Sequence, residues 1–93
     1  MATGTATINF GAAPGSTTTT VAVTGQTAIL SGSNVEAWIM GDSTADHNAY
    51  EHAFIQRYCG LSCGGIVPST GFTITANSKL RLTGTFTVRW VWA

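Results

Sequence analysis

The chain has 93 residues, enough for one domain and too few for two separate hydrophobic cores. Charged residues make up only 9% of it, against about 25% in an average domain, and the four basic and four acidic residues cancel. This balance supplies no electrostatic attraction to nucleic acid or anionic lipid, so neither is an expected partner. Near-zero net charge also leaves little repulsion between copies, which favours self-association.

Hydroxyl side chains take the place of the missing charges, with 16 Thr and 7 Ser. Threonine is branched at Cβ and stiff at χ1, which favours strands over helices. The sequence shows no secretory signal, and no apolar run approaches the ~20 residues that cross a bilayer. We therefore expect a single all-β domain over residues 1–93 that is made in a cytoplasm and has no membrane partner.

The first half of the chain predicts four strands. Each segment combines β-branched or aromatic residues with alternation, and each ends at a turn rich in Gly, Pro or Ser. The threonine run at 16–20 leads into the second strand, although a flexible linker is the alternative for the run itself. The predicted strands are residues 5–10, 21–23 with its threonine approach, 26–30 and 34–40.

Residues 46–58 allow two structures. Tyr50, Phe54 and Tyr58 recur at even spacing, which favours a strand from about Tyr50 onward. The polar beginning of the segment instead suits a helix with Ser43 or Thr44 as its N-cap. We predict the strand, and a single helical turn just before it is the alternative.

The second half predicts a turn followed by four short strands. Residues 59–65 are rich in glycine and predict the turn, in which Cys59 and Cys63 are free or loosely paired thiols. Residues 77–79 predict a second turn. The predicted strands are residues 66–67, cut off by Pro68, then 71–76, 80–82 and 85–92. About eight short strands in all predict an antiparallel β-sandwich or jelly roll.

The closing strand carries the strongest local pattern. Alternation places Phe86, Val88, Trp90 and Trp92 on one face, and Thr85, Thr87, Arg89 and Val91 on the other. We assign Phe86 and Val88 to the core of the domain, together with Ile74 and Phe72. Tryptophan is enriched at subunit contacts. We therefore predict an assembly interface formed by Trp90, Trp92, Arg89 and Trp38.

One polar cluster gathers side chains of catalytic type. Its members are Asp42, Ser43, Asp46, His47, Glu51 and His52. No nucleophile-elbow pattern surrounds the serine, and a triad needs its members and an oxyanion hole brought together by the fold. We therefore predict no catalytic residues and no enzyme.

Metal binding has only weak candidates, His47 and His52, with Asp46 or Glu51 as oxygen ligands. The two histidines are five residues apart, which fits neither one face of a helix nor one face of a strand. Cys59 and Cys63 follow no zinc-finger or redox spacing. We therefore expect no metal and no cofactor, and structural polar contacts for the histidines.

Six pieces of the sequence carry a resemblance to a known family: residues 6–11, 23–26, 32–38, 44–47 with 51–52, 71–74 and 84–92. Through these pieces the chain resembles short proteins encoded among the structural genes of tailed bacteriophages and prophages. The family's shared pattern leaves out Cys59 and Cys63, and it carries no catalytic residues to transfer to this sequence.

This resemblance implies a structural component of the virion, present in many copies and bound to other virion proteins. A tail or fibre component that assembles as a homo-oligomer is the first expectation, with a trimer favoured because phage fibres are commonly threefold. A capsid decoration protein is the second. A module that binds a host glycan through Trp38, Tyr50 or Trp92 is the alternative from a different functional class.

Overall fold

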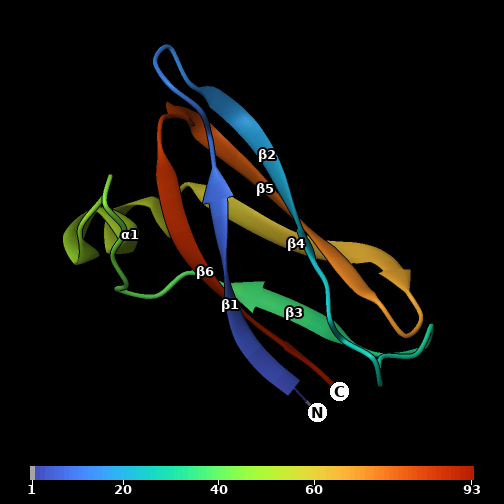
Figure 1. The fold of residues 1–93 in the computed structure, drawn as a ribbon. Helices are drawn as coiled ribbons and strands as arrows, with labels where there is room; N and C mark the ends of the chain where they lie inside the picture. The colour runs from blue at the N-terminus through green and yellow to red at the C-terminus, as the bar shows by residue number, and fades with distance from the viewer. Residues whose placement is uncertain (1) are drawn as a thin grey trace.

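The structure is a computed structural model that describes residues 2–93. This part of the chain forms six β-strands and one short α-helix, so the expected predominance of β-structure is confirmed. In chain order the elements are β1 (Ala2–Asn9), β2 (Ser16–Val23), β3 (Val35–Trp38), α1 (Ala49–Ile55), β4 (Cys59–Val67), β5 (Gly71–Leu82) and β6 (Thr85–Trp92) (Figure 1).

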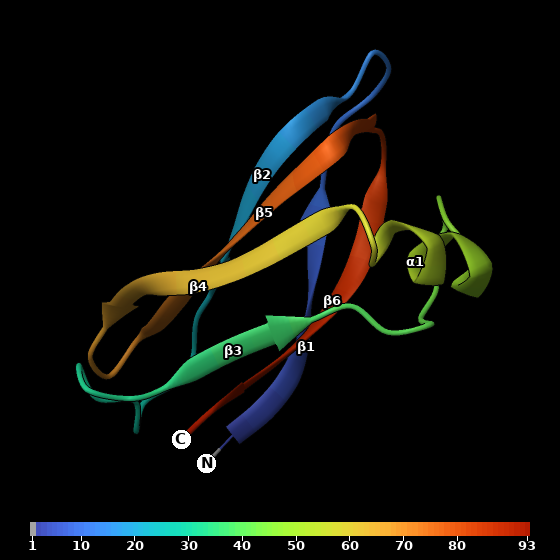
Figure 2. The same cartoon turned by 180° about the vertical axis from the view of Figure 1, so that it is seen from behind.

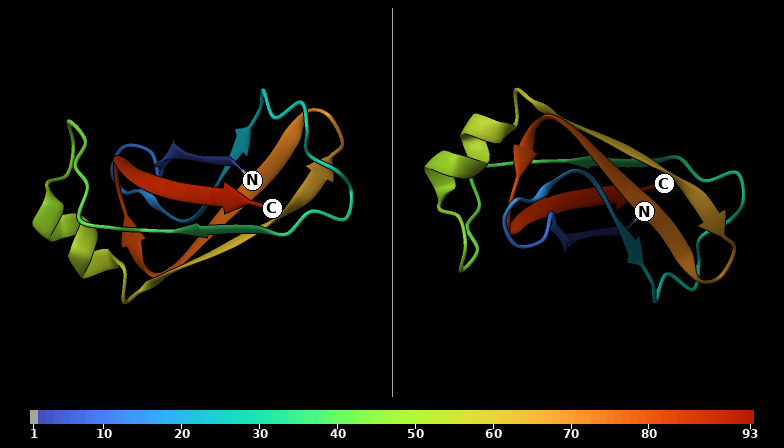
Figure 3. Two further views of the ribbon diagram at one scale, coloured as in Figure 1. Left: turned by 90° about the horizontal axis from the view of Figure 1, so that it is seen from below. Right: turned by 90° about the horizontal axis from the view of Figure 1, so that it is seen from above.

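The strands form two three-stranded sheets, with the orders β1-β6-β3 and β2-β5-β4, and all neighbours are antiparallel (Figure 2). β6 and β5 are the central strands. β1 pairs with β6 along its whole length, from Ala2 opposite Trp92 to Asn9 opposite Thr85. This pairing brings the two ends of the chain side by side (Figure 3).

The core is built on the alternation of β6, in which every second side chain is buried. Inner side chains of β5 meet those of β6, and the rings of Phe72 and Trp90 contact edge to face with centroids 5.5 Å apart. Burial of an apolar side chain of this size contributes about 1.5–3 kcal/mol. The residues placed here include all four predicted core residues, Phe72, Ile74, Phe86 and Val88, together with Ile8 and Ala76.

The prediction of a strand from Tyr50 is wrong, because residues 49–55 form α1. Asn48, rather than Ser43 or Thr44, is the N-cap, and its side chain and that of Glu51 form a reciprocal capping box. A spacing of four residues also places side chains on one helical face. The even spacing of the aromatic residues therefore did not distinguish helix from strand.

The prediction of about eight strands is also wrong, because residues 2–93 form six. Residues 59–65 are not a turn but most of β4, and the predicted turn at 77–79 lies inside β5. The reason is tertiary pairing: Asn77 lies opposite Thr18 of β2 on one side and Gly60 of β4 on the other. A central strand that is hydrogen-bonded on both sides holds residues whose intrinsic preference is for turns.

Residues 26–30 form a loop instead of the predicted third strand. Ile29 in this loop is fully buried, and its carbonyl accepts a hydrogen bond from the Ser69 N–H at 3.0 Å. The apolar residue that suggested a strand thus anchors a loop to the core. The fourth predicted strand is shorter than expected, because β3 covers only Val35–Trp38.

Candidate functional site

The polar cluster at residues 42–52 lies along the second edge of β6. β3 covers only the last part of that edge, from Arg89 to Trp92. The first part of β6 extends beyond the end of β3, and its backbone groups there still need hydrogen-bond partners. Side chains from residues 42–52 supply them.

Asp46 holds the beginning of β6. Its Oδ2 accepts hydrogen bonds from the Thr85 N–H at 2.9 Å and from the Thr85 hydroxyl at 2.7 Å. The hydroxyl and then the backbone N–H of Thr85 lower the pKa of the Asp46 carboxyl. Gly84 allows this approach, because a Cβ at that position would lie 3.0 Å from Asp46. The carboxylate therefore acts as a fixed acceptor for the backbone.

His52 is fully buried and holds the next part of the strand. The Thr87 N–H donates to His52 Nε2 at 2.9 Å, and His52 Nδ1 lies 2.9 Å from the carbonyl of Asn48. Because an N–H can only donate and a carbonyl can only accept, Nδ1 carries the ring proton. Both ring nitrogens are therefore occupied, and the imidazole joins α1 to β6.

His47 lies beside the same strand, stacked on the ring of Phe86 with centroids 4.0 Å apart. Its Nε2 donates to the Thr83 carbonyl at 2.6 Å. Its Nδ1 is buried and faces Glu51 Oε2 at 3.4 Å without a well-formed hydrogen bond. The Asn48 N–H, and after it His47, lowers the pKa of the Glu51 carboxyl. His47 thus links the turn between β5 and β6 to the first turn of α1.

Arg89 and Asp42 form a bidentate ion pair. Arg89 Nε donates to Asp42 Oδ2 at 2.9 Å, and Arg89 Nη2 donates to Asp42 Oδ1 at 2.7 Å. These hydrogen bonds to Arg89 lower the pKa of the Asp42 carboxyl. Arg89, predicted at an assembly interface, is therefore already paired within its own chain.

Backbone and hydroxyl groups complete the attachment of this segment. The Thr44 hydroxyl donates to the Thr85 carbonyl at 2.8 Å, and the Thr87 hydroxyl donates to the Ser43 carbonyl at 3.4 Å. Ser43 thus contributes its backbone to the contact with β6. The residues of catalytic type in this cluster replace a missing neighbour strand.

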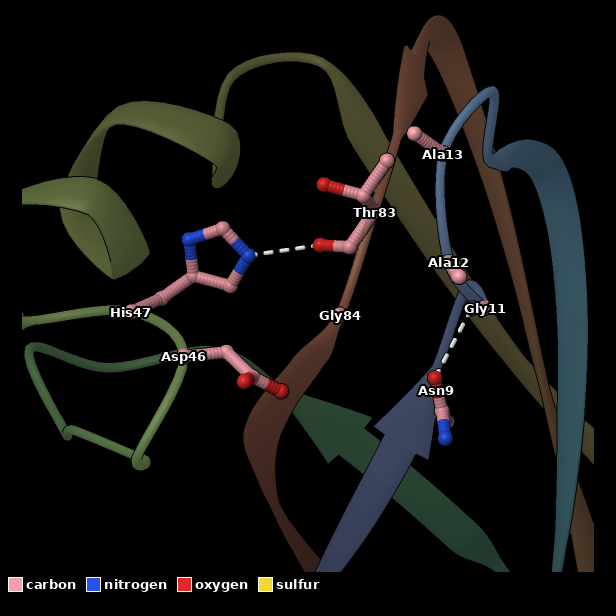
Figure 4. Close-up of a pocket in the computed structure, with 8 residues that line it drawn as sticks. All are labelled: Asn9, Gly11, Ala12, Ala13, Asp46, His47, Thr83 and Gly84. Carbon is pink, nitrogen blue, oxygen red and sulfur yellow. Dashed lines mark hydrogen bonds between the residues drawn. The ribbon is translucent and has the colours of Figure 1, made fainter.

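An open hollow of about 500 Å³ adjoins the cluster. Figure 4 shows Asp46 and His47 on one side of Thr83 and Gly84, with the turn after β1 on the other. Asp46 Oδ2 and His47 Nε2 already bind Thr85 and Thr83. The remaining residues that line the hollow are Asn9, Gly11, Ala12 and Ala13.

The two histidines do not converge on a metal position, because His52 uses both ring nitrogens for the backbone. Within residues 2–93 no three His, Cys, Asp or Glu side chains gather in a way that could hold a metal ion. Cys59 and Cys63 are free thiols on the inner side of β4, and burial raises the pKa of both. A raised pKa disfavours the thiolate, the form that binds metals and reacts.

Trp90 and Trp92 belong to the core of their own chain, which corrects the division of β6 into core and interface halves. They are 6% and 8% exposed. Trp90 packs against Gly4, where a Cβ would lie 2.5 Å from the indole ring. Trp92 donates its indole N–H to Gln26 Oε1 at 2.9 Å. Both indole rings are thus held by contacts within the chain, Trp90 by β1 and Trp92 by the loop after β2.

Trp38, the remaining predicted interface residue, is 36% exposed and lies opposite Arg89 in the pairing of β3 with β6. Tyr50 and Phe54 of α1 are also exposed. Sequence reasoning did not identify Asn48, Thr85 or Thr87 as functional partners of the cluster. The Asn48-x-x-Glu51 spacing of a capping box was a usable signal for the first of them.

No helix in residues 2–93 is long and apolar enough to cross a membrane. The chain was also compared with protein-family models, with curated proteins and with solved structures. None of the three comparisons finds a match.

Proposed function

We propose that the chain is a non-enzymatic structural protein of a tailed bacteriophage, a tail or fibre component that assembles as a homo-oligomer. It is made in the host cytoplasm and acts in the virion, bound to other virion proteins. The resemblance described above motivates the phage assignment and favours a trimer. Two features of the fold support a structural role.

The first feature is the use of the polar cluster. Asp46 and His52 accept hydrogen bonds from backbone N–H groups of β6, and Asp42 is paired with Arg89. A catalytic acid or base needs its reactive atom free to meet a substrate. Side chains fixed in this way support a structural rather than a catalytic role.

The second feature carries the proposal. On the outer face of the sheet β2-β5-β4, the residues that lie opposite one another across all three strands include no charged side chain. Burial of a charge at an interface costs desolvation free energy. Another protein surface can therefore cover a face without charges at a small desolvation cost. Small side chains also let that surface approach closely. The outward residues are Thr18, Thr20 and Ala22 of β2, Gly60, Ser62 and Gly64 of β4, and Thr73, Thr75 and Asn77 of β5.

We also propose that the two sheets form a β-sandwich. The contact between Phe72 of one sheet and Trp90 of the other supports this arrangement. Sandwich architecture would give the virion a small rigid unit with two outer faces, which suits repeated packing in many copies.

Sedimentation of the purified chain tests the assembly. We expect a homo-oligomer at micromolar concentration, and the sedimenting mass distinguishes a trimer from a dimer. A monomer over the whole concentration range would contradict the proposal. Imaging of intact phage particles then locates the chain: density in the tail or fibre supports the first assignment, and density on the capsid supports a decoration protein.

Glycan binding is the second candidate, because Trp38 is exposed next to the Arg89–Asp42 ion pair. An aromatic ring beside fixed polar groups is a surface on which a sugar ring can stack. Binding of host-surface oligosaccharides would be lost in Trp38→Ala and retained in Tyr50→Ala. If neither variant changes binding, or the wild type binds no oligosaccharide, this candidate is wrong.

A further inference from the structure

β1 is an edge strand whose outer side is open. β6 covers its inner side along all eight residues, without a bulge. The N–H and C=O groups of one strand residue point toward the same neighbouring strand, and those of the next residue point toward the opposite side. Thr85 and Thr87 direct their N–H groups to Asp46 and His52, away from β1. The alternate residues of β6, Phe86 and Val88 among them, therefore bond to β1.

The register then identifies the open backbone groups of β1. Ile8 and Ala6 lie opposite Phe86 and Val88, so their backbone groups bond to β6. Those of Thr3, Thr5 and Thr7 point outward, and within residues 2–93 no hydrogen bond reaches them. Asn9 confirms the direction, because its carbonyl accepts a bond from the Thr19 hydroxyl outside the β1–β6 pair, at 2.8 Å. The three threonine side chains are themselves exposed.

This edge lacks the features that keep strand edges apart. Proteins protect such edges with charged residues, proline, bulges or very short strands. β1 has eight residues and contains no charged residue and no proline. By contrast, β3 has four residues and β4 is interrupted by a bulge between Gly64 and Val67. In β2 the Ser16 hydroxyl already occupies the N–H and carbonyl of Thr18.

The sequence of β1 is complementary to itself. Threonine occupies positions 3, 5 and 7, with glycine and alanine between them. When two such strands pair antiparallel with Thr5 opposite Thr5, Thr3 of each strand lies opposite Thr7 of the other. Every residue whose backbone groups point away from β6 then lies opposite a threonine. Each opposed pair then exchanges two N–H···O=C bonds, and threonine pairs across strands are favourable. This arrangement satisfies all the open groups of Thr3, Thr5 and Thr7.

We propose that β1 pairs with β1 of a second copy of this chain, antiparallel about a two-fold axis, with Thr5 opposite Thr5 of the partner subunit. The inference rests on one part of the proposed function, that the chain assembles with itself, and it replaces the threefold state favoured by the resemblance with a two-fold one. It joins two sheets into one of six strands, in the order β3-β6-β1 followed by the same strands of the partner in reverse. Such a contact is isologous and gives a dimer, or a larger assembly with an even number of chains.

Charge substitutions at the axis test the contact by sedimentation at several concentrations. Thr5→Lys places two ammonium groups opposite each other, and like charges in that position are destabilising. We expect the dissociation constant of the dimer to rise roughly tenfold or more. Thr5→Glu has the same effect alone, and an equimolar mixture of the two variants restores the dimer. Thr27→Lys, at an exposed threonine of the loop after β2 that lies outside β1 and outside the uncharged face, is the matched control and leaves the dimer unchanged.

A second variant tests the register and does not depend on Thr5. Thr3→Lys combined with Thr7→Glu in one chain places opposite charges across from each other twice, so the dimer is retained. Thr3→Lys combined with Thr7→Lys dissociates it. Circular dichroism of each variant establishes that the fold is intact.

The outcomes separate this contact from the proposed function. An oligomer that survives Thr5→Lys, or that Thr27→Lys disrupts equally, overturns the β1 contact and leaves the proposed self-assembly standing. A trimeric mass in the wild type also overturns the two-fold pairing. A wild-type chain that is monomeric at every concentration overturns both.

Discussion

His52 shows how a residue of catalytic type can be wholly structural. It is fully buried, and each ring nitrogen bonds a backbone group, one in β6 and one in the turn before α1. A buried N–H left without its acceptor costs about 1–3 kcal/mol, and a cavity adds to that cost. The imidazole is therefore needed for its shape and its two nitrogen positions.

His52→Ala is expected to lower the free energy of unfolding by about 2–4 kcal/mol, because it removes the acceptor of the Thr87 N–H and leaves a cavity. Urea denaturation followed by tryptophan fluorescence measures the loss. His52→Gln is the matched control, since its amide oxygen can reach the Nε2 position and it should lose less. Equal stability of the alanine variant and the wild type would show that the imidazole contributes nothing to the fold.

Gly84 is a second residue with a specific physical requirement. Its φ of 75° is left-handed, and a Cβ there would lie 3.0 Å from Asp46. Gly84→Ala is therefore expected to cost about 1–3 kcal/mol through backbone strain and displacement of Asp46. Thermal unfolding measures this cost. Gly32→Ala is the control, because a Cβ at Gly32 meets nothing within 4 Å, and a similar loss in both variants would contradict the explanation.

At the scale of elements, the segment from Asp42 to α1 supplies hydrogen-bond partners to the backbone of β6, as a neighbouring strand would, although the segment is not a strand. Backbone pairing by β3 stops at Arg89, and side chains then continue along the edge of β6 as far as Thr85. Hydrogen bonds between backbone groups do not change as the pH falls in the acidic range. Carboxylates, in contrast, gain a proton there and become weaker acceptors. The attachment of this segment is therefore expected to depend on pH.

Hydrogen bonds lower the pKa of Asp42, Asp46 and Glu51 in the folded chain. A lowered folded pKa means that the unfolded chain binds protons first as the pH falls. The stabilisation is thus fully present above the ordinary carboxyl pKa of about 4, and it is lost as the pH falls through the lower folded values. Melting temperatures between pH 7 and pH 2 are expected to fall most steeply below about pH 4.

Asp46→Asn tests the contribution of one of these carboxyls. The amide oxygen can still accept from Thr85, but it does not titrate, so the decline in melting temperature below pH 4 becomes shallower. Glu36→Gln, on an exposed position of β3, is the control. An identical pH profile in Asp46→Asn and the wild type would mean that the Thr85 contact has no linkage to proton binding.

At the scale of the whole molecule, the two sheets share one small core to which both tryptophans of β6 contribute. A domain of this size has a total stability of about 5–15 kcal/mol. Loss of a large aromatic side chain from the core costs about 3–5 kcal/mol. The core therefore has little tolerance for the loss of either ring.

Trp92→Ala is expected to leave the chain largely unfolded at 37 °C, rather than folded and merely dissociated. The indole ring is 8% exposed, and its N–H bonds Gln26, so its loss affects both the core and the loop after β2. Near-ultraviolet circular dichroism distinguishes the outcomes. Trp38→Ala is the control, with an exposed ring and a small expected effect. A folded monomer in Trp92→Ala would restore the view that Trp92 serves a subunit contact.

The sequence was sufficient to predict a strand where apolar and polar residues alternate strictly over a continuous segment. β6 was predicted with its observed bounds, 85–92, and with the observed faces, because strict alternation over eight residues fits only a strand with one buried side. The short strand predicted at 66–67 is strand and stops before Pro68, but it is the end of β4, whose earlier part was predicted as a turn. Structural polar contacts were also expected for His47 and His52, but their partners, backbone groups that include the Thr83 carbonyl and the Thr87 N–H, were not.

What the sequence by itself determined was composition and alternation: a mostly β chain, few charges, and an inner face on β6. Only the tertiary structure decided that residues 59–65 and 77–79 are strand, because their pairing partners lie far away in the chain. It likewise decided that Trp90 and Trp92 are core and that His52 and Asp46 serve the backbone of β6. Alternation reports which side chains share a face, whereas burial and hydrogen bonding depend on what the fold brings against that face.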